Sequence, residues 1–131
     1  IYLNEDNVTL RGIVDLAIGR VEPNVASRLL IDHKTGNARP EFAEEMRFYA
    51  LVLALSKPGA PPYRIASYFV ESGEWQAEDV DGRVLEHTAK RVGRAARLAI
   101  DIVNETAQPT LTPGPYCSWC PRAKTCPSSA A

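Results

Sequence analysis

The chain has 131 residues, of which 45% are hydrophobic and 24% charged, a balance typical of one globular domain with its own core. No apolar run approaches the roughly 20 residues of a membrane span, and we expect a cytoplasmic protein with no membrane partner. The formal net charge of −1 excludes a uniformly basic surface, so nucleic-acid binding would need basic residues clustered on one part of the molecule.

The first predicted structure is a hairpin. Residues 1–3 form a short strand, residues 4–7 have turn chemistry, and residues 8–18 form the second strand. Gly12 indicates a close approach of another group to this strand. Asp15 interrupts the apolar run, and a charge in such a place needs a partner or an ion. Because the chain starts almost inside a strand, we expect a piece of a larger protein, trimmed at its N-terminus.

A polar loop over residues 19–27 leads to a buried strand over residues 29–34, which ends in a charged tripeptide. Successive side chains of a strand point to opposite faces. Asp32 and Lys34 therefore share one face, and His33 points to the other. The simplest interpretation is that the carboxylate and the ammonium group only neutralise each other.

Antiparallel pairing of these two strands would bring Asp15 and Asp32 together. Two like charges held close repel each other unless a cation lies between them. Carboxylate oxygens are ligands that magnesium and manganese prefer. Such a metal lowers the pKa of a bound water, and a lysine beside it can orient or deprotonate that water. The pattern predicts a hydrolytic metal site.

Residues 40–56 are predicted to form a helix. Proline suits its first position, and the glutamates that follow favour the positive end of the helix dipole. Glu45 and Tyr49 lie four residues apart, on neighbouring parts of the helix surface. Taken alone, they are a surface acid and a core aromatic. The apolar residues that should face the sheet are Phe42, Met46, Tyr49, Ala50 and Leu53.

Two further strands and a long helix follow. Residues 63–71 and 74–80 are predicted as strands joined by a turn, with Trp75 covering the sheet. The helix spans residues 83–106 with an apolar stripe of Leu85, Thr88, Val92, Ala96, Ala99 and Val103. Its basic residues lie largely on another side, and two interpretations stay open: a solvated face, or a surface that follows nucleic-acid phosphates. These residues are Arg83, Lys90, Arg94 and Arg97.

Three cysteines lie close together after a connector at residues 107–114 that is rich in proline and threonine. Cys117, Cys120 and Cys126 have the spacing Cys-x2-Cys-x5-Cys. An odd, clustered set fits metal binding in a reducing compartment better than disulfides. Zinc and iron–sulfur clusters both accept such ligands, and each normally takes four. Reduced thiols without a bound metal are the remaining alternative.

Together these pieces resemble the PD-(D/E)xK nucleases of the RecB type, including AddB-like and CRISPR-associated relatives, over nearly the whole chain. The resemblance implies an α/β, restriction-endonuclease-like fold, with a mixed β-sheet of four or five strands flanked by helices. It also implies a single domain over residues 1–131, with a nuclease core at 1–106 and a cysteine-cluster tail at 107–131. The matching motifs are Gly12-Ile13-Val14-Asp15 and Ile31-Asp32-His33-Lys34-Thr35-Gly36.

The resemblance also assigns roles to the residues of these motifs. Asp15 and Asp32 would bind magnesium or manganese, with the backbone carbonyl of His33 as a further ligand. Lys34 would position the attacking water or stabilise the pentavalent phosphate. The products of phosphodiester hydrolysis would be a 5′-phosphate and a 3′-hydroxyl.

The helix motif of the family departs from its usual form here. Family members carry Gln-x-x-x-Tyr after the Asp-x-Lys strand. Tyr49 matches the tyrosine, whereas Glu45 stands where glutamine is usual. Both side chains are expected to help position Lys34 or the DNA, and the carboxylate would either repel phosphate or add a contact to the metal or the lysine.

The cysteines complete the resemblance. In many RecB-like nucleases three C-terminal cysteines at this spacing join one cysteine far upstream to hold a [4Fe–4S] cluster with a structural role. Cys117, Cys120 and Cys126 would be the three, and the fourth cysteine is expected to precede Ile1. A zinc site, with the domain acting mainly as an interaction module, is the alternative.

The sequence thus predicts a metal-dependent deoxyribonuclease, an exonuclease on single-stranded DNA or DNA ends in DNA repair, recombination or CRISPR adaptation. A helicase or a CRISPR adaptation protein is the expected partner. The alternative function is a catalytically inactive, nuclease-fold module that binds DNA or acts as a scaffold in a helicase–nuclease complex.

Overall fold

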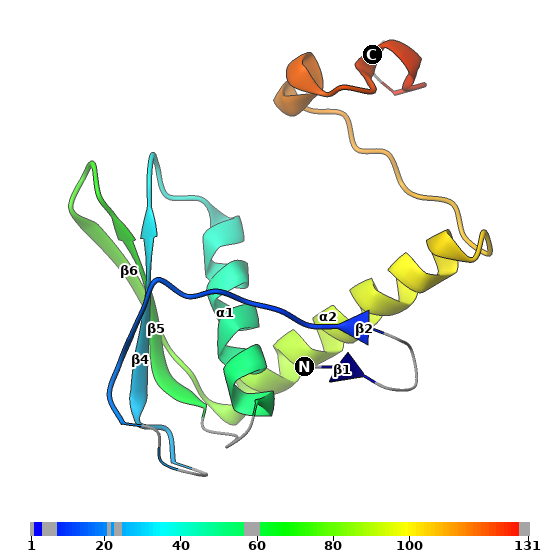
Figure 1. The fold of residues 1–131 in the computed structure, drawn as a ribbon. Coiled ribbons are helices and arrows are strands. Elements are labelled where there is room, and N and C mark those ends of the chain that lie inside the picture. Colours follow the sequence, from blue (N-terminus) through cyan, green and yellow to red (C-terminus); the bar gives the residue numbers. More distant parts are fainter. Residues whose placement is uncertain (1, 4–7, 21, 23–24, 57–60, 129–131) are drawn as a thin grey trace. The chain divides into compact units, whose positions relative to one another are not determined.

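The computed structural model describes residues 2–3, 8–20, 22, 25–56 and 61–128 (Figure 1). It divides into two compact units, residues 1–97 and 98–131, and each is described by itself. The first unit contains a sheet of four strands in the order β3-β4-β5-β6. These strands are β3 (Leu16–Ile18), β4 (Arg28–Lys34), β5 (Pro62–Phe69) and β6 (Glu74–Asp79).

The sheet is mixed. β3 and β6 run antiparallel to their neighbours, whereas the central strands β4 and β5 are parallel. A parallel pair needs a crossover connection, and helix α1 (Pro40–Leu55) supplies it. The predicted α/β class, with a mixed sheet flanked by helices, is confirmed. The parallel register sets Asp32 beside Ser67 and Lys34 beside Phe69.

Helix α1 covers one face of this sheet (Figure 1). It begins at Pro40, as predicted, with Glu41 in its first turn. It ends at Leu55, where the Ser56 N–H still donates to the carbonyl of Val52 at 3.0 Å. The core lies between the helix and the sheet, and the fully buried side chains at its centre are Leu30, Met46, Ala50 and Ile65.

The predicted hairpin of β5 and β6 is confirmed, with the turn between Phe69 and Glu74. Gly73 has a φ of +70°, a conformation that an L-residue rarely adopts, and this explains glycine at the turn. Trp75 lies on the face opposite α1, with its ring centroid 4.6 Å from that of Tyr68, and it remains 54% exposed.

The prediction of one strand over residues 8–18 is wrong. Strand β2 (Val8–Thr9) pairs antiparallel with β1 (Tyr2–Leu3), and strand β3 begins only at Leu16. Residues 10–15 between them are irregular. The turn predicted at residues 4–7 lies outside the described residues. The strand is interrupted before Leu16 because the Asp15 carboxylate takes the place of a backbone carbonyl. It accepts the N–H of His33 on β4.

Helix α2 (Gly82–Val103) follows β6. Asp81 caps its start, because its carboxylate accepts the N–H groups of Arg83 and Val84, each at 2.9 Å. The helix packs on α1 through Arg91, whose Nη2 donates to the carbonyl of Glu44 at 3.2 Å.

The second unit begins within α2, at Leu98, and continues into two short 3₁₀ helices, η1 (Pro115–Trp119) and η2 (Ala123–Thr125). The predicted apolar stripe of α2 is not buried along its whole length, since Ala99 is exposed and Val103 is 80% exposed. A helical period makes a face apolar, but only a packing partner buries it. Among the described residues, no helix is long and apolar enough to cross a membrane.

Candidate active site

Asp32 and Lys34 stand at the end of β4 on the face that α1 covers. Their side chains alternate with His33, as the strand period requires. The Lys34 Nζ lies 2.6 Å from the Asp32 Oδ2, and the two side chains are only 11% and 9% exposed. Buried charges of this kind need partners, because desolvation is costly for each ion.

Glu45 supplies a second partner from α1. Its Oε2 lies 2.5 Å from the Lys34 Nζ, so the ammonium group bridges two carboxylates from different elements. The Tyr49 hydroxyl donates to the other oxygen of Glu45 at 2.6 Å. The four side chains Asp32, Lys34, Glu45 and Tyr49 therefore form one continuous hydrogen-bonded chain across the strand and the helix.

Two apolar contacts fix this chain in place. A Cβ atom on Gly12 would lie 2.8 Å from the Tyr49 ring, so only glycine lets the backbone pass so close, and the predicted close approach is confirmed. The Phe42 ring centroid lies 4.8 Å from the Lys34 Nζ, a cation–π distance. Phe42 in turn packs on Phe69, which is fully buried. The sequence analysis did not predict the contact of Phe42 with Lys34. The signal was available, because Phe42 and Glu45 are three residues apart and therefore share one face of the helix.

Asp15 lies at the neighbouring edge of β4. Its Oδ2 accepts the backbone N–H of His33 at 2.8 Å and lies 3.4 Å from the imidazole Nδ1. The antiparallel pairing of β3 with β4 holds it there, as predicted, although Asp15 itself precedes the strand. Asp15 is half exposed, whereas Asp32 is buried.

The charges of the site perturb one another. Partial burial alone would lower the pKa of Lys34, but hydrogen bonds to Asp32 and Glu45 outweigh it and raise that pKa. The hydrogen bond from Lys34, with a second from Tyr49, lowers the pKa of Glu45. Lys34 is thus held as a cation at neutral pH, which favours stabilising negative charge over accepting a proton.

Hydrogen bonds also shift the pKa values of Asp15 and Tyr49, in opposite directions. The N–H of His33 lowers the pKa of the Asp15 carboxyl group. The hydrogen bond that Tyr49 donates to Glu45 raises the pKa of its phenol, with burial as a further cause. Both keep the protonation states that the hydrogen bonds need: an ionised Asp15 and a neutral Tyr49.

The donor set suits a hard divalent cation. The carboxylates of Asp32 and Glu45 contact the Lys34 ammonium group, and Asp15 lies beside them on His33; oxygen-only ligands of this kind fit magnesium or manganese. Within the described part of the chain, no three His, Cys, Asp or Glu side chains converge on one point as they would around a metal ion. The Lys34 ammonium group instead contacts both Asp32 and Glu45.

A groove opens beside the site between α1 and α2. It has a volume of about 640 Å³, and Glu45 forms part of its wall. Its other lining residues are mostly apolar or acidic: Val8, Leu10, Glu41, Glu44, Phe48, Arg91, Val92, Ala95 and Ala96. The groove leaves the Glu45 end of the site open to a larger molecule.

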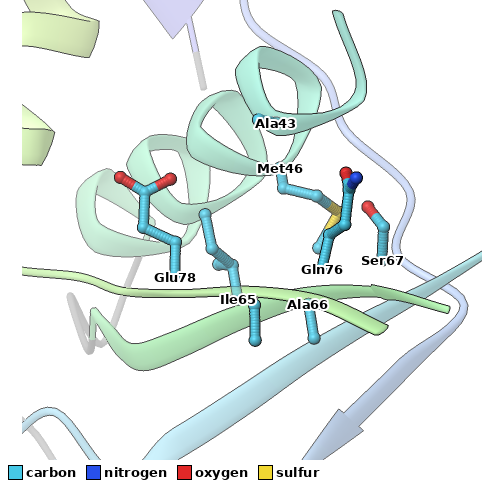
Figure 2. Close-up of a pocket in the computed structure, with 8 residues that line it drawn as sticks. Ala43, Met46, Ile65, Ala66, Ser67, Gln76 and Glu78 are labelled. Carbon is cyan, nitrogen blue, oxygen red and sulfur yellow. The ribbon is translucent and has the colours of Figure 1, made fainter. Parts of the chain in front are cut away.

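A smaller cavity of about 100 Å³ lies between α1 and strands β5 and β6 (Figure 2). Ser67 and Gln76 point into it from neighbouring positions of the two strands, and Ser67 is itself the neighbour of Asp32. Asp32, Ser67 and Gln76 thus form a polar row across three strands under α1. The cavity holds a few water molecules at most and is too small for a nucleotide.

The three cysteines belong to the second unit. Cys117 lies in η1, and Cys120 and Cys126 directly follow the two 3₁₀ helices. They line one cavity of about 130 Å³ together with Tyr116 and neighbouring residues. The short turns therefore gather the thiols around one space, although the sulfur atoms do not close on a common centre.

Comparison with known proteins agrees with this geometry. The family model described as the PD-(D/E)XK nuclease superfamily matches residues 2–127, which is nearly the whole chain. The matched region includes the Asp-x-Lys strand, helix α1 and the cysteines. No curated protein matches the chain.

Proposed function

Since the chain belongs to the PD-(D/E)XK nuclease superfamily, whose members are generally phosphodiesterase nucleases that use divalent metals, we propose that it is a magnesium- or manganese-dependent deoxyribonuclease of the RecB-like exonuclease type. Its substrate would be single-stranded DNA or a DNA end. The observation that carries the proposal is the buried Asp32–Lys34 pair at the end of β4, with Glu45 and Tyr49 against it and Asp15 alongside.

The carboxylates supply the oxygen ligands in this mechanism. Asp15 and Asp32 would hold the metal with the carbonyl of His33, and a metal bound there would supply an activated water and would stabilise charge on a phosphate oxygen. Glu45, in place of the usual glutamine, would add a further oxygen once Lys34 releases it. The negative charge of Glu45, which glutamine lacks, would offset part of the positive charge of the bound cation.

Lys34 would act as a fixed positive charge. Its ammonium group contacts the Asp32 carboxylate and lies over the Phe42 ring. A cation held in a partly buried site stabilises the charge that develops on the pentavalent phosphate more strongly than one in water. Tyr49 is a positioning residue in this account, because it acts through Glu45 and not on the DNA.

The cysteine tail would hold a [4Fe–4S] cluster. Cys117, Cys120 and Cys126 provide three thiolates around one cavity, and the fourth ligand would come from outside these residues. The domain would then consist of the nuclease core at 1–106 and the cysteine tail at 107–131. A helicase or a CRISPR adaptation protein is the proposed partner, with a role in DNA repair, recombination or CRISPR adaptation.

Cleavage of end-labelled single-stranded DNA in Mn²⁺ tests the nuclease proposal. We expect linear strands to be degraded and closed circles to stay intact, as for an exonuclease. Asp32→Asn keeps the side-chain shape but removes the charge that holds the metal, and should abolish cleavage. Asp79→Asn, an exposed aspartate paired with Arg64, is the matched control and should cleave normally. Binding of Mn²⁺ and DNA without any cleavage would instead indicate the inactive, scaffold-type module.

Optical absorbance tests the cluster. Protein purified without oxygen should be brown, with a broad band at about 400 nm that disappears in Cys120→Ser. Ser118→Ala, two residues away, is the control and should keep the band. Colourless protein that contains stoichiometric zinc would replace the iron–sulfur assignment with a zinc site.

A further inference from the structure

Helix α2 carries an unusual concentration of positive charge. Between Gly82 and Arg97 it has five basic side chains and one acidic side chain, Glu86, a formal charge of +4 in a chain whose total is −1. The rest of the chain therefore carries −5. A protein with a small negative total can still present a strongly basic surface when its charges are separated in this way.

Four of these basic residues lie on one face. Arg83, Lys90, Arg94 and Arg97 recur at intervals of seven, four and three residues, the spacing of one helix stripe. All four are exposed, whereas the opposite side carries the buried Thr88 and the half-buried Val92. We call these four residues the basic ridge. Arg91, the fifth, points instead to Glu44 on α1.

The charges of the ridge are available to a ligand. Among the described residues, no carboxylate lies within ion-pair distance of Arg94 or Arg97. Arg83 and Lys90 contact Asp81 and Glu86, but these pairs are exposed to solvent. Exposed ion pairs of this kind contribute little to stability, so a phosphate can replace either carboxylate at little cost.

The candidate active site cannot by itself attract the negatively charged DNA backbone. Its Lys34 ammonium group is already paired with Asp32 and Glu45, and Arg91 in the groove beside it is paired with Glu44, while Glu41 adds a further negative charge. A DNA backbone approaching this end of the molecule meets negative charge. Affinity for the backbone must therefore come from another surface of the same unit.

We propose that the basic ridge of α2 binds the phosphate backbone of the DNA substrate, outside the site where cleavage occurs. This inference rests on the proposed function, because it takes DNA as the ligand. From Arg83 to Arg97 the helix rises about 21 Å at 1.5 Å per residue, the length of roughly six phosphates at the 3.4 Å spacing of one strand in a duplex. Such contacts hold the strand without reading its sequence.

The salt dependence of binding is the test. Fluorescein-labelled oligothymidylate is titrated with the full chain in EDTA, so that no cleavage occurs, at several salt concentrations. Each phosphate contact on a single strand contributes about 0.7 to the slope of log K against log salt. The double variant Arg94→Gln/Arg97→Gln should therefore lower that slope by about 1.4 and weaken binding at low salt.

A matched variant separates local from global charge. Arg20→Gln/Arg64→Gln removes the same two positive charges from exposed positions elsewhere in the first unit. It should leave the slope unchanged, and circular dichroism should show both variants folded. Cleavage of saturating DNA in Mn²⁺ should keep its kcat in Arg94→Gln/Arg97→Gln, with a raised KM.

The outcomes distinguish the two proposals. A wild-type chain that binds and cleaves DNA while Arg94→Gln/Arg97→Gln keeps the full slope overturns the ridge and leaves the nuclease proposal standing. An equal loss of slope in both double variants overturns the ridge as well, because the effect would then follow net charge alone. A chain that neither binds nor cleaves DNA overturns the proposed function, and the ridge with it.

Discussion

Lys34→Met should lower metal-dependent DNA cleavage by at least about 100-fold, the usual effect of removing one fixed electrostatic stabiliser from a reacting site. Methionine keeps most of the length and apolar stem of the side chain but carries no charge. The variant should still bind Mn²⁺, because a divalent cation can replace the ammonium group as the partner of Asp32 and Glu45. Rates of cleavage and calorimetric titration with Mn²⁺ measure the two effects separately.

Arg64→Met is the control for this experiment. Its Nε also lies 2.6 Å from a carboxylate, that of Asp79, but this pair is exposed on another part of the sheet. Cleavage should stay at the wild-type rate there. Undiminished cleavage by Lys34→Met would remove Lys34 from the mechanism and move the active site elsewhere. Loss of both cleavage and Mn²⁺ binding would show that the variant disrupts the site as a whole.

Phe69→Ala should destabilise the protein by about 3–5 kcal/mol, the cost of emptying a buried aromatic position. Phe69 is fully buried at the end of β5, where it supports the Phe42 ring against Lys34. The total stability of a small domain is about 5–15 kcal/mol, so this single change removes a large part of it. Urea unfolding followed by circular dichroism measures the free energy of unfolding.

Phe48→Ala is the matched control, since Phe48 is the same residue type on α1 but only half buried, on the wall of the groove. It should cost about 1–2 kcal/mol, because much of its ring is already in water. Equal losses for the two variants would contradict the assignment of Phe69 to the core. If Phe69→Ala fails to fold, Phe69→Leu, which keeps most of the volume, should fold with an intermediate loss.

In the candidate site, sequence patterns predict which side chains share a face but not which elements contact each other. The alternation of β4 was enough to set Asp32 and Lys34 on one face, and the helical spacing of α1 was enough to set Glu45 near Tyr49. Neither pattern predicts whether the strand pair contacts the helix pair. The Lys34–Glu45 contact joins side chains from two elements, and only the packing of α1 on the sheet brings them to 2.5 Å.

The strand predicted over residues 8–18 failed for a related reason. Its apolar run did not predict that the Asp15 carboxylate, in place of a backbone carbonyl, would accept the His33 N–H. Side-chain acceptors compete with backbone carbonyls for the same donors, and the winner depends on which donor the neighbouring strand presents. That neighbour is eighteen residues away along the chain.

The sequence by itself determined both helices, the strands from β4 to β6, the face that each presents and the residue types of the site, because these follow from local periods of two and 3.6 residues. The family membership was also predicted from the motifs and is now shown over residues 2–127. The tertiary structure alone decided the parallel pairing of β4 with β5, the bridge of Lys34 between two carboxylates and the exposed end of α2. These depend on contacts between segments far apart in the chain, whose energies no local pattern contains.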